Sequence, residues 1–311
     1  MQRLLTTTIL VGLLVATAAA FAVTERLKLT KSPIFDTVVY PKNGFSPKCG
    51  CARGKATVRI KLRHADLVSV SILDAKKSPI RSLADGVHVS RGLNVFRWDG
   101  RTDGNVIAKD GTYKAEIHLS GQHRTIVLPN EILLDTTAPA VTSVAANRDA
   151  FSPDGDHQAD FIRIRYELSK PAHVNLYLDG NRILRTYRHP ATGSFSWFGR
   201  ANGAALPPGS YTLDVGAVDA AGNSTPVAER QRIHVRIRFI ELASKRIVVA
   251  AGKRFSIGVS TDATRYTWKL GARKSFAVGP VLRLKASTRH GRYTLTVSER
   301  GHVDRATVLV R

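Results

Sequence analysis

The chain has 311 residues, of which 43% are hydrophobic, and its formal net charge is +23. This length suits two or three domains of about 100 residues each, and the hydrophobic content excludes wholesale disorder. The positive balance predicts attraction to polyanions such as nucleic acid, acidic membrane or anionic wall polymer. A single Met and abundant Val, Ile, Thr and Arg favour strands over helices.

The first predicted element is an apolar, uncharged run of 20 residues, Leu4 to Val23, behind a basic start at Arg3. A run of this length can cross a bilayer as a helix, which predicts a membrane anchor. Ala20-Phe21-Ala22 also fits the cleavage site of a signal peptide. We favour the anchor over the cleaved signal because the run exceeds a usual signal core. Both interpretations predict export, either as a single-pass membrane protein or as a secreted one.

The charges beside this run do not favour an external C-terminus. Three basic residues follow it (Arg26, Lys28 and Lys31), whereas Arg3 and the amino terminus precede it. The positive-inside rule therefore gives no support for export. The expectation of an extracellular location depends on the domains that follow.

The next predicted elements occur twice. Residues 45–73 and 151–179 align without a gap, starting at Phe45 and Phe151. Both copies alternate apolar and polar residues, first over Ala56 to Leu62 and then over Ile162 to Leu168. Alternation at a period of two predicts strands with one buried face and one solvated face.

Each copy continues with a tryptophan, a glycine-rich stretch and a Gly-x-Tyr signal. The shared positions are Trp98, Gly111 and Tyr113 in the first copy, and Trp197, Gly209 and Tyr211 in the second. We interpret the tryptophans as buried plates that close one end of a sandwich, and Gly-x-Tyr as the start of a strand. The alternative is that these aromatic residues form a ligand platform. Because buried aromatics at sandwich corners are commoner, we favour the structural role.

These patterns predict an all-β protein of tandem sandwich domains after an N-terminal transmembrane or signal helix. A third, shorter and more divergent unit repeats the final strand signal at Gly291-x-Tyr293. The predicted boundaries are residues 1–33 for the anchor and juxtamembrane segment, 34–136 and 137–237 for the two clear repeats, and 238–311 for a basic C-terminal β unit.

Two stretches of the second copy resemble a known family. FSPDGDHQADFIRIRYELSKPAHVNLYL and WFGRANGAALPPGSYTLDV look like the FlgD-type Ig-like domain of bacterial secreted and flagellar hook-capping proteins. DTTAPAV and AVDAAGNSTP are similar to junctions and end strands of bacterial extracellular Ig-like domains. The resemblance covers roughly residues 45–235 and implies a non-catalytic module used as a spacer, structural piece or adhesive surface outside the cell. Such a likeness specifies a fold rather than an activity.

Cys49 and Cys51 are the whole cysteine content. In an extended strand, residues two apart are too distant for a relaxed disulfide, but Gly50 permits a tighter turn. A disulfide is therefore the first expectation for an exported chain. Intermolecular pairing, thiol-redox exchange and, with His64, a metal site are the alternatives.

Asp154, Asp156 and Asp160 have part of the spacing of a calcium loop. The expected glycine is replaced by His157, and no glutamate follows at the required distance. An ordinary Asx turn explains the same residues. We expect no metal and no cofactor, and keep these three aspartates as the calcium candidates.

The sequence predicts a protein that is not an enzyme. It contains no H-E-x-x-H, G-x-S-x-G, phosphate-binding glycine loop or C-x-x-C. The prediction is a structural or adhesive protein of the cell envelope. The alternatives are an exported enzyme accessory or thiol-redox protein that uses Cys49 and Cys51, and a nucleic-acid-binding protein.

The C-terminal unit carries about half of the excess charge. Residues 238–311 contain 16 lysines and arginines against 4 acids, as in the alternating stretch Val281 to Lys285. Solvated strand faces explain the alternation, but solubility does not require so few acids. We expect an anionic wall polymer, an anionic membrane polymer or another envelope protein as the partner. Aromatics such as Trp268 keep nucleic acid as the less favoured partner.

Overall fold

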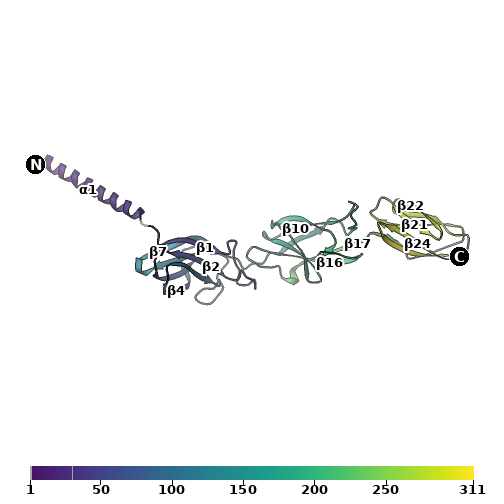
Figure 1. The fold of residues 1–311 in the computed structure, drawn as a ribbon, viewed down its shortest axis with the longest axis horizontal. Helices are drawn as coiled ribbons and strands as arrows, with labels where there is room; N and C mark the ends of the chain where they lie inside the picture. Colours follow the sequence, from purple (N-terminus) through teal and green to yellow (C-terminus); the bar gives the residue numbers. More distant parts are fainter. Residues whose placement is uncertain (1, 30) are drawn as a thin grey trace. The chain divides into compact units, whose positions relative to one another are not determined.

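The computed structural model describes residues 2–29 and 31–311, and it describes side chains for residues 9–22 and 31–311. One long helix, α1 (Gln2–Leu29), precedes a chain built almost wholly of strands (Figure 1). The chain divides into two compact units, residues 1–136 and 137–311. Two short 3-10 turns, η1 (Ser120–Gln122) and η2 (Val227–Glu229), interrupt the strands.

Within the described residues, no helix combines the length and the hydropathy of a membrane span. The predicted anchor begins and ends in residues whose side chains lie outside this description, namely residues 4–8 and 23. The membrane anchor and the signal peptide remain predictions.

The first unit contains two antiparallel sheets. The three-stranded sheet has the order β1-β2-β5 and consists of β1 (Ile34–Tyr40), β2 (Ala56–Leu62) and β5 (Gly92–Trp98). The four-stranded sheet has the order β4-β3-β6-β7 and consists of β3 (Asp66–Leu73), β4 (Pro79–Val89), β6 (Gly111–Leu119) and β7 (Arg124–Leu134).

The second unit begins with a sandwich of similar design. Its three-stranded sheet has the order β13-β10-β8, from β8 (Val141–Ala146), β10 (Ile162–Leu168) and β13 (Thr192–Trp197). Its five-stranded sheet has the order β12-β11-β16-β17-β9, from β9 (Ala150–Phe151), β11 (His173–Leu178), β12 (Asn181–Arg185), β16 (Gly209–Val218) and β17 (Gln231–Ile237). A small hairpin joins β14 (Arg200–Ala201) to β15 (Ala204–Ala205).

The same unit ends with a third sandwich. Its three-stranded sheet has the order β18-β20-β23, from β18 (Ile240–Leu242), β20 (Arg254–Thr261) and β23 (Val281–Lys285). Its five-stranded sheet has the order β19-β25-β24-β21-β22, from β19 (Arg246–Val249), β21 (Tyr266–Leu270), β22 (Arg273–Ala277), β24 (Gly291–Glu299) and β25 (His302–Val310). The short C-terminal segment therefore forms a complete sandwich.

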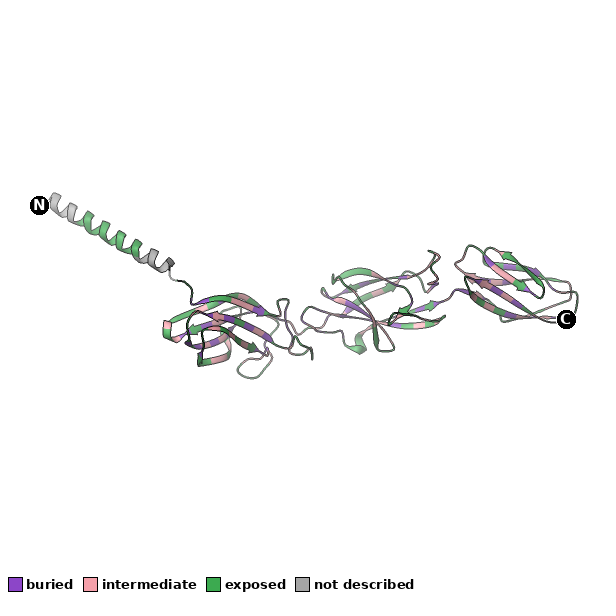
Figure 2. Cartoon of the chain, in the orientation of Figure 1, coloured by how far each residue is buried: buried purple, intermediate pink, exposed green. Residues whose placement is uncertain are grey.

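Each sandwich has its own hydrophobic core. The three cores involve separate stretches of the chain, residues 34–134, 141–239 and 240–310. Buried and exposed residues alternate along strands such as β10, in which every second side chain is buried (Figure 2). This alternation places one face of each sheet against the core. The predicted all-β class of tandem sandwiches is confirmed.

The first two sandwiches place their repeated sequences at corresponding positions. Ala56 of β2 lies opposite Trp98, and Ile162 of β10 lies opposite Trp197. The aligned phenylalanines also pair in parallel with the last strand of each sandwich, Phe45 with Leu134 and Phe151 with Ile237. The repeat in sequence is thus a repeat in strand register.

Candidate functional site

The repeated tryptophans lie inside the sandwich corners. The exposed fraction is 0% for Trp98 and 2% for Trp197. Each indole donates its N–H to a backbone oxygen three residues later, Arg101 O at 2.8 Å and Arg200 O at 2.9 Å. Both rings also pack on the aligned phenylalanine, with ring centroids 5.4 Å and 5.6 Å apart. Both indole rings are therefore packed in the core, and neither ring exposes a face on which a ligand could stack.

The tyrosine of each Gly-x-Tyr signal makes one recurring hydrogen bond. In each sandwich the tyrosine hydroxyl donates to the backbone oxygen of the residue four positions earlier. The three bonds are Tyr113 to Lys109 O (2.5 Å), Tyr211 to Pro207 O (2.6 Å) and Tyr293 to Arg289 O (2.9 Å). All three sandwiches therefore share this corner. Gly111 and Gly209 are the first residues of β6 and β16, where each Gly-x-Tyr opens its strand.

Trp268 differs from the other tryptophans because it lies in the middle of β21, opposite Val297 and Ser275.

Cys49 and Cys51 form a disulfide across a two-residue separation. Gly50 between them has φ of 59°, a conformation that glycine adopts without a steric cost. The loop around them is held by backbone bonds from Ser46 N to Arg53 O and from Cys49 N to Ser46 O. His64 lies outside this loop.

The predicted calcium residues divide into two groups. The carboxylate of Asp160 accepts hydrogen bonds from the backbone N–H groups of Gly155 and His157, at 2.7 and 2.8 Å. It stabilises the loop and does not join the other two aspartates in an acidic cluster. Asp154 and Asp156 each accept a backbone N–H at one carboxylate oxygen in an Asx turn, from Asp156 N and Gln158 N respectively. The second oxygen of Asp156 accepts a longer bond from Gln158 Nε2 at 3.4 Å, whereas that of Asp154 has no donor in the described part of the chain.

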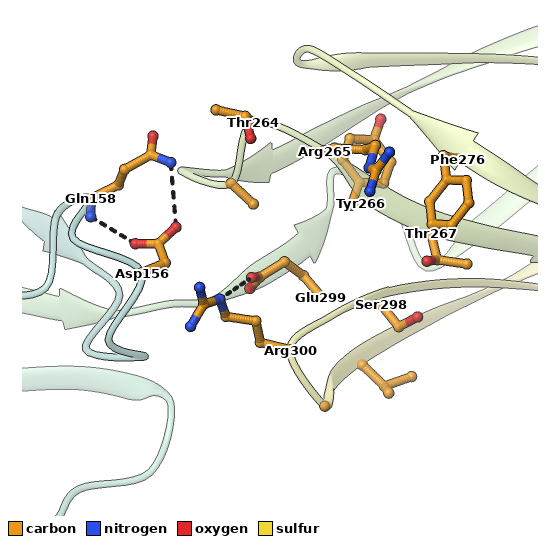
Figure 3. Close-up of a pocket in the computed structure, with 13 residues that line it drawn as sticks. Asp156, Gln158, Thr264, Arg265, Tyr266, Thr267, Phe276, Ser298, Glu299 and Arg300 are labelled. Atoms are coloured by element: carbon orange, nitrogen blue, oxygen red, sulfur yellow. Dashed lines mark hydrogen bonds and ion pairs between the residues drawn. The ribbon is translucent and has the colours of Figure 1, made fainter.

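Asp154 and Asp156 meet Glu299, a residue from the third sandwich. One carboxylate oxygen from each of the three lies within 4.8 Å of the others. Glu299 is the last residue of β24, at the turn into β25. Asp156 and Glu299, both labelled in Figure 3, are among the residues that line an open pocket of about 740 Å³. Asp262, which follows β20, interacts electrostatically with the same group. We call these four residues, Asp154, Asp156, Asp262 and Glu299, the acidic cluster.

Two carboxyl groups of the acidic cluster have raised pKa values. Burial, the nearby charge of Asp154 and the charges of Asp156 and Asp262 together raise the pKa of Glu299 to about 7. Burial also raises the pKa of Asp262 to about 6, with Asp156 and Asp154 acting in the same direction. Desolvation and mutual repulsion therefore both oppose ionisation at this site.

Several oxygens of the acidic cluster are buried and have no hydrogen-bond partner among the described residues. They include Asp154 Oδ2 and Glu299 Oε2. Asp262 differs, because hydrogen bonds from its own backbone N–H and from the Ser152 hydroxyl lower its pKa against the larger effect of burial. The nearest counter-charge is Arg300, whose Nε lies 3.7 Å from Glu299 Oε1. A buried oxygen without a partner costs free energy, so the cluster is chemically incomplete as it stands.

Sequence reasoning found one half of the acidic cluster and missed the other. Asp154 and Asp156 are conspicuous because they lie two residues apart in a loop. Asp262 and Glu299 are isolated in sequence and belong to another sandwich. The scarcity of acids was the one sequence signal for these two residues, because residues 238–311 contain only 4 acids against 16 basic residues. Two of those four acids belong to the cluster.

The third sandwich also has four basic residues on or beside β23, the edge strand of its three-stranded sheet. Leu282 and Leu284 of β23 are buried, whereas Arg283 and Lys285 are exposed. Arg254 of β20 lies directly opposite Lys285. Arg273 from β22 donates to the backbone oxygen of Lys285. We call these four residues, Arg254, Arg273, Arg283 and Lys285, the basic face.

No protein-family model and no curated protein matches the sequence. Among solved structures, the chain is similar to the D0–D1 domain of intimin at 13% identity, with a TM-score of 0.26, over 66% of this chain and 98% of that chain. It is similar to an I-band fragment of titin at 11% identity, with a TM-score of 0.31, over 90% and 99% of the two chains. A third similar structure is SGBP-B of the Bacteroides ovatus mixed-linkage glucan utilization locus, in complex with a mixed-linkage heptasaccharide, at 17% identity, with a TM-score of 0.22, over 90% and 69%. These TM-scores are low, so the similarities carry no functional argument for this chain.

Proposed function

We propose that this chain is a non-enzymatic, exported protein of the cell envelope. In this proposal, tandem Ig-like sandwiches of the FlgD type act as a scaffold, and the third sandwich presents a basic surface to anionic wall or membrane polymers. The N-terminal apolar run attaches the chain to the membrane. A scaffold role is supported by the two tryptophans and three corner tyrosines, whose rings and polar groups are used inside the sandwiches.

The basic face carries the polyanion part of the proposal. Arg254 and Lys285 are directly opposite each other on neighbouring strands. Like charges in this position destabilise a sheet. The arrangement therefore weakens the sandwich unless an anionic ligand offsets it, and a chain of phosphate or carboxylate groups has the required charge and repeat.

The acids of the third sandwich are engaged elsewhere. Glu241 pairs with Arg236 at 2.9 Å, and Asp304 pairs with Lys245. Asp262 and Glu299 belong to the acidic cluster. Among the described residues, the segment 238–311 thus has no acid left to neutralise the basic face.

The test is the salt dependence of binding by the full chain. The double variant Arg283→Gln and Lys285→Gln removes two exposed charges and leaves the buried leucines of β23 in place. Each neutralised contact contributes roughly 0.7–0.9 to the slope of log affinity against log salt, so removing two contacts should lower the slope by about 1.4–1.8. Elution from a sulfonate matrix and binding to vesicles containing phosphatidylglycerol would both measure it.

A matched control removes the same charge from the second sandwich. Arg182 and Arg185 are exposed residues of β12, and their change to Gln should leave most of the binding intact. If both double variants lose binding equally, the basic face has no special role. Tighter binding to duplex DNA than to either anionic surface would favour the nucleic-acid alternative.

Thiol-redox chemistry is the second candidate function, and one observation favours it. The disulfide joins residues two apart in sequence, and Cys51 is exposed. A reductant can therefore reach the bond. Thiol titration of the full chain before and after mild reduction, in parallel with activity toward a substrate disulfide, would separate a redox protein from a structural crosslink.

A further inference from the structure

We propose that the acidic cluster is a calcium site that joins the second sandwich to the third. The loop after β9 provides Asp154 and Asp156, the β24–β25 turn provides Glu299, and the segment after β20 provides Asp262. This is a different surface from the basic face, so the proposal is independent of polyanion binding.

Glu299 provides the observation that distinguishes this group from an ordinary acidic patch. Its side chain is only 5% exposed, and Oε2 has no hydrogen-bond partner. A carboxylate oxygen of this residue nevertheless lies within 4.8 Å of the oxygens of Asp154 and Asp156. Leaving a charge buried among like charges is costly, and a bound cation would convert the repulsion into attraction.

Arg300 alone does not complete the site. Its guanidinium reaches Glu299 Oε1 at 3.7 Å and is 53% exposed, so it gives a weak pair with one oxygen of one residue. Asp154 Oδ2 and Glu299 Oε2 remain buried without a hydrogen-bond donor among the described residues. A divalent ion between the carboxylates can contact several of these oxygens at once.

The donor set selects the type of metal. Every candidate ligand atom in the cluster is a carboxylate oxygen, with the hydroxyl of Ser152 beside them. Hard cations prefer such ligands, whereas zinc prefers nitrogen and sulfur. Calcium accepts irregular arrangements of six to eight oxygens, and magnesium demands a near-ideal octahedron. Ligands from three separate loops favour calcium.

The two Asx turns prepare the loop for this role. In Asp154 and Asp156, one oxygen is fixed by a backbone N–H at 3.1 and 2.7 Å respectively. Asp154 Oδ2 has no donor among the described residues and can face the ion without a large loss of side-chain freedom, and Asp156 Oδ2 is held only by the 3.4 Å bond from Gln158 Nε2. Asp160 supports the arrangement from behind by holding the amides of Gly155 and His157.

The experiment is thermal unfolding of the full chain by scanning calorimetry at pH 8, in EDTA, in calcium chloride and in magnesium chloride. For an extracellular-type site with Kd of about 0.1–1 mM, about 10 mM calcium should raise the unfolding midpoint of the second unit by roughly 3–8 °C. Magnesium should raise it much less. An equal rise with both ions, or no rise with calcium, would overturn the proposal.

The variant Glu299→Gln separates a lost site from a damaged fold. Without calcium it should unfold at the same temperature as the parent chain or higher, because it removes a buried like charge. It should also lose most of the rise caused by calcium. The control Glu167→Gln, an exposed acid of β10, should keep the full rise. If Glu299→Gln kept the rise, the acidic cluster would not bind the ion.

Discussion

Gly100 is the residue on which the first sandwich corner depends most directly. Its φ is 76°, and an added Cβ would lie 3.1 Å from Pro47 Cγ and 3.2 Å from both Leu134 Cδ1 and Phe45 Cε2. Gly199 has the corresponding position in the second sandwich, with φ of 65° and Ile237 Cδ1 at 3.0 Å. The same glycine thus allows the chain to pass close to the core in both copies.

We expect Gly100→Ala to lower the free energy of unfolding of the first unit by about 2–3 kcal/mol, because it combines a left-handed backbone with overpacking. Gly104→Ala is the control, since its Cβ would approach only Thr102 Oγ1, at 3.7 Å. It should change stability by less than about 0.5 kcal/mol. Urea unfolding of both variants measures the difference, and equal effects would show that the corner tolerates a side chain.

Asp304 connects two elements of the third sandwich, β25 and β18. Burial raises its pKa, but the backbone N–H of Leu242, at 2.7 Å, and the ammonium of Lys245 outweigh burial and leave the pKa below its ordinary value of 3.8. The folded state therefore binds this proton more weakly than the unfolded state does. The resulting stability is present above the ordinary pKa and is lost as the pH falls through the lowered one.

We expect Asp304→Asn to reduce the stability of the second unit by about 1 kcal/mol near neutral pH. The difference from the parent chain should shrink as the pH falls below 4, because the parent carboxylate then becomes protonated. Denaturant unfolding at several pH values would measure it. A difference that stays constant down to pH 3 would mean that the charge of Asp304 contributes nothing.

The strands were predictable from sequence because their signal is local. The alternation in Ala56 to Leu62 and Ile162 to Leu168 corresponds to β2 and β10 residue for residue. Trp268 was harder to place, because an aromatic residue in a strand and one at a corner look alike in sequence.

The acidic cluster was only half predictable. Glu299 meets Asp154 through the packing of two sandwiches, and no local pattern records that contact.

At the scale of the whole molecule, the three sandwiches differ in the chemistry of their side chains. The first two sandwiches repeat one corner design, whereas the third combines a basic face with two acids of the acidic cluster. The third sandwich is thus the part with unsatisfied electrostatics on its surface. This contrast is the reason for proposing the first two sandwiches as a scaffold and the third as a binding module.

Export is the central claim, because an anionic wall polymer and a calcium site of millimolar affinity both require it. The most direct test is the protease accessibility of a C-terminal tag in intact cells that make the full chain. We expect protease added outside, after permeabilisation of any outer membrane, to remove the tag while a cytoplasmic marker stays intact. A tag that is cleaved only after the cytoplasmic membrane is broken would contradict the account.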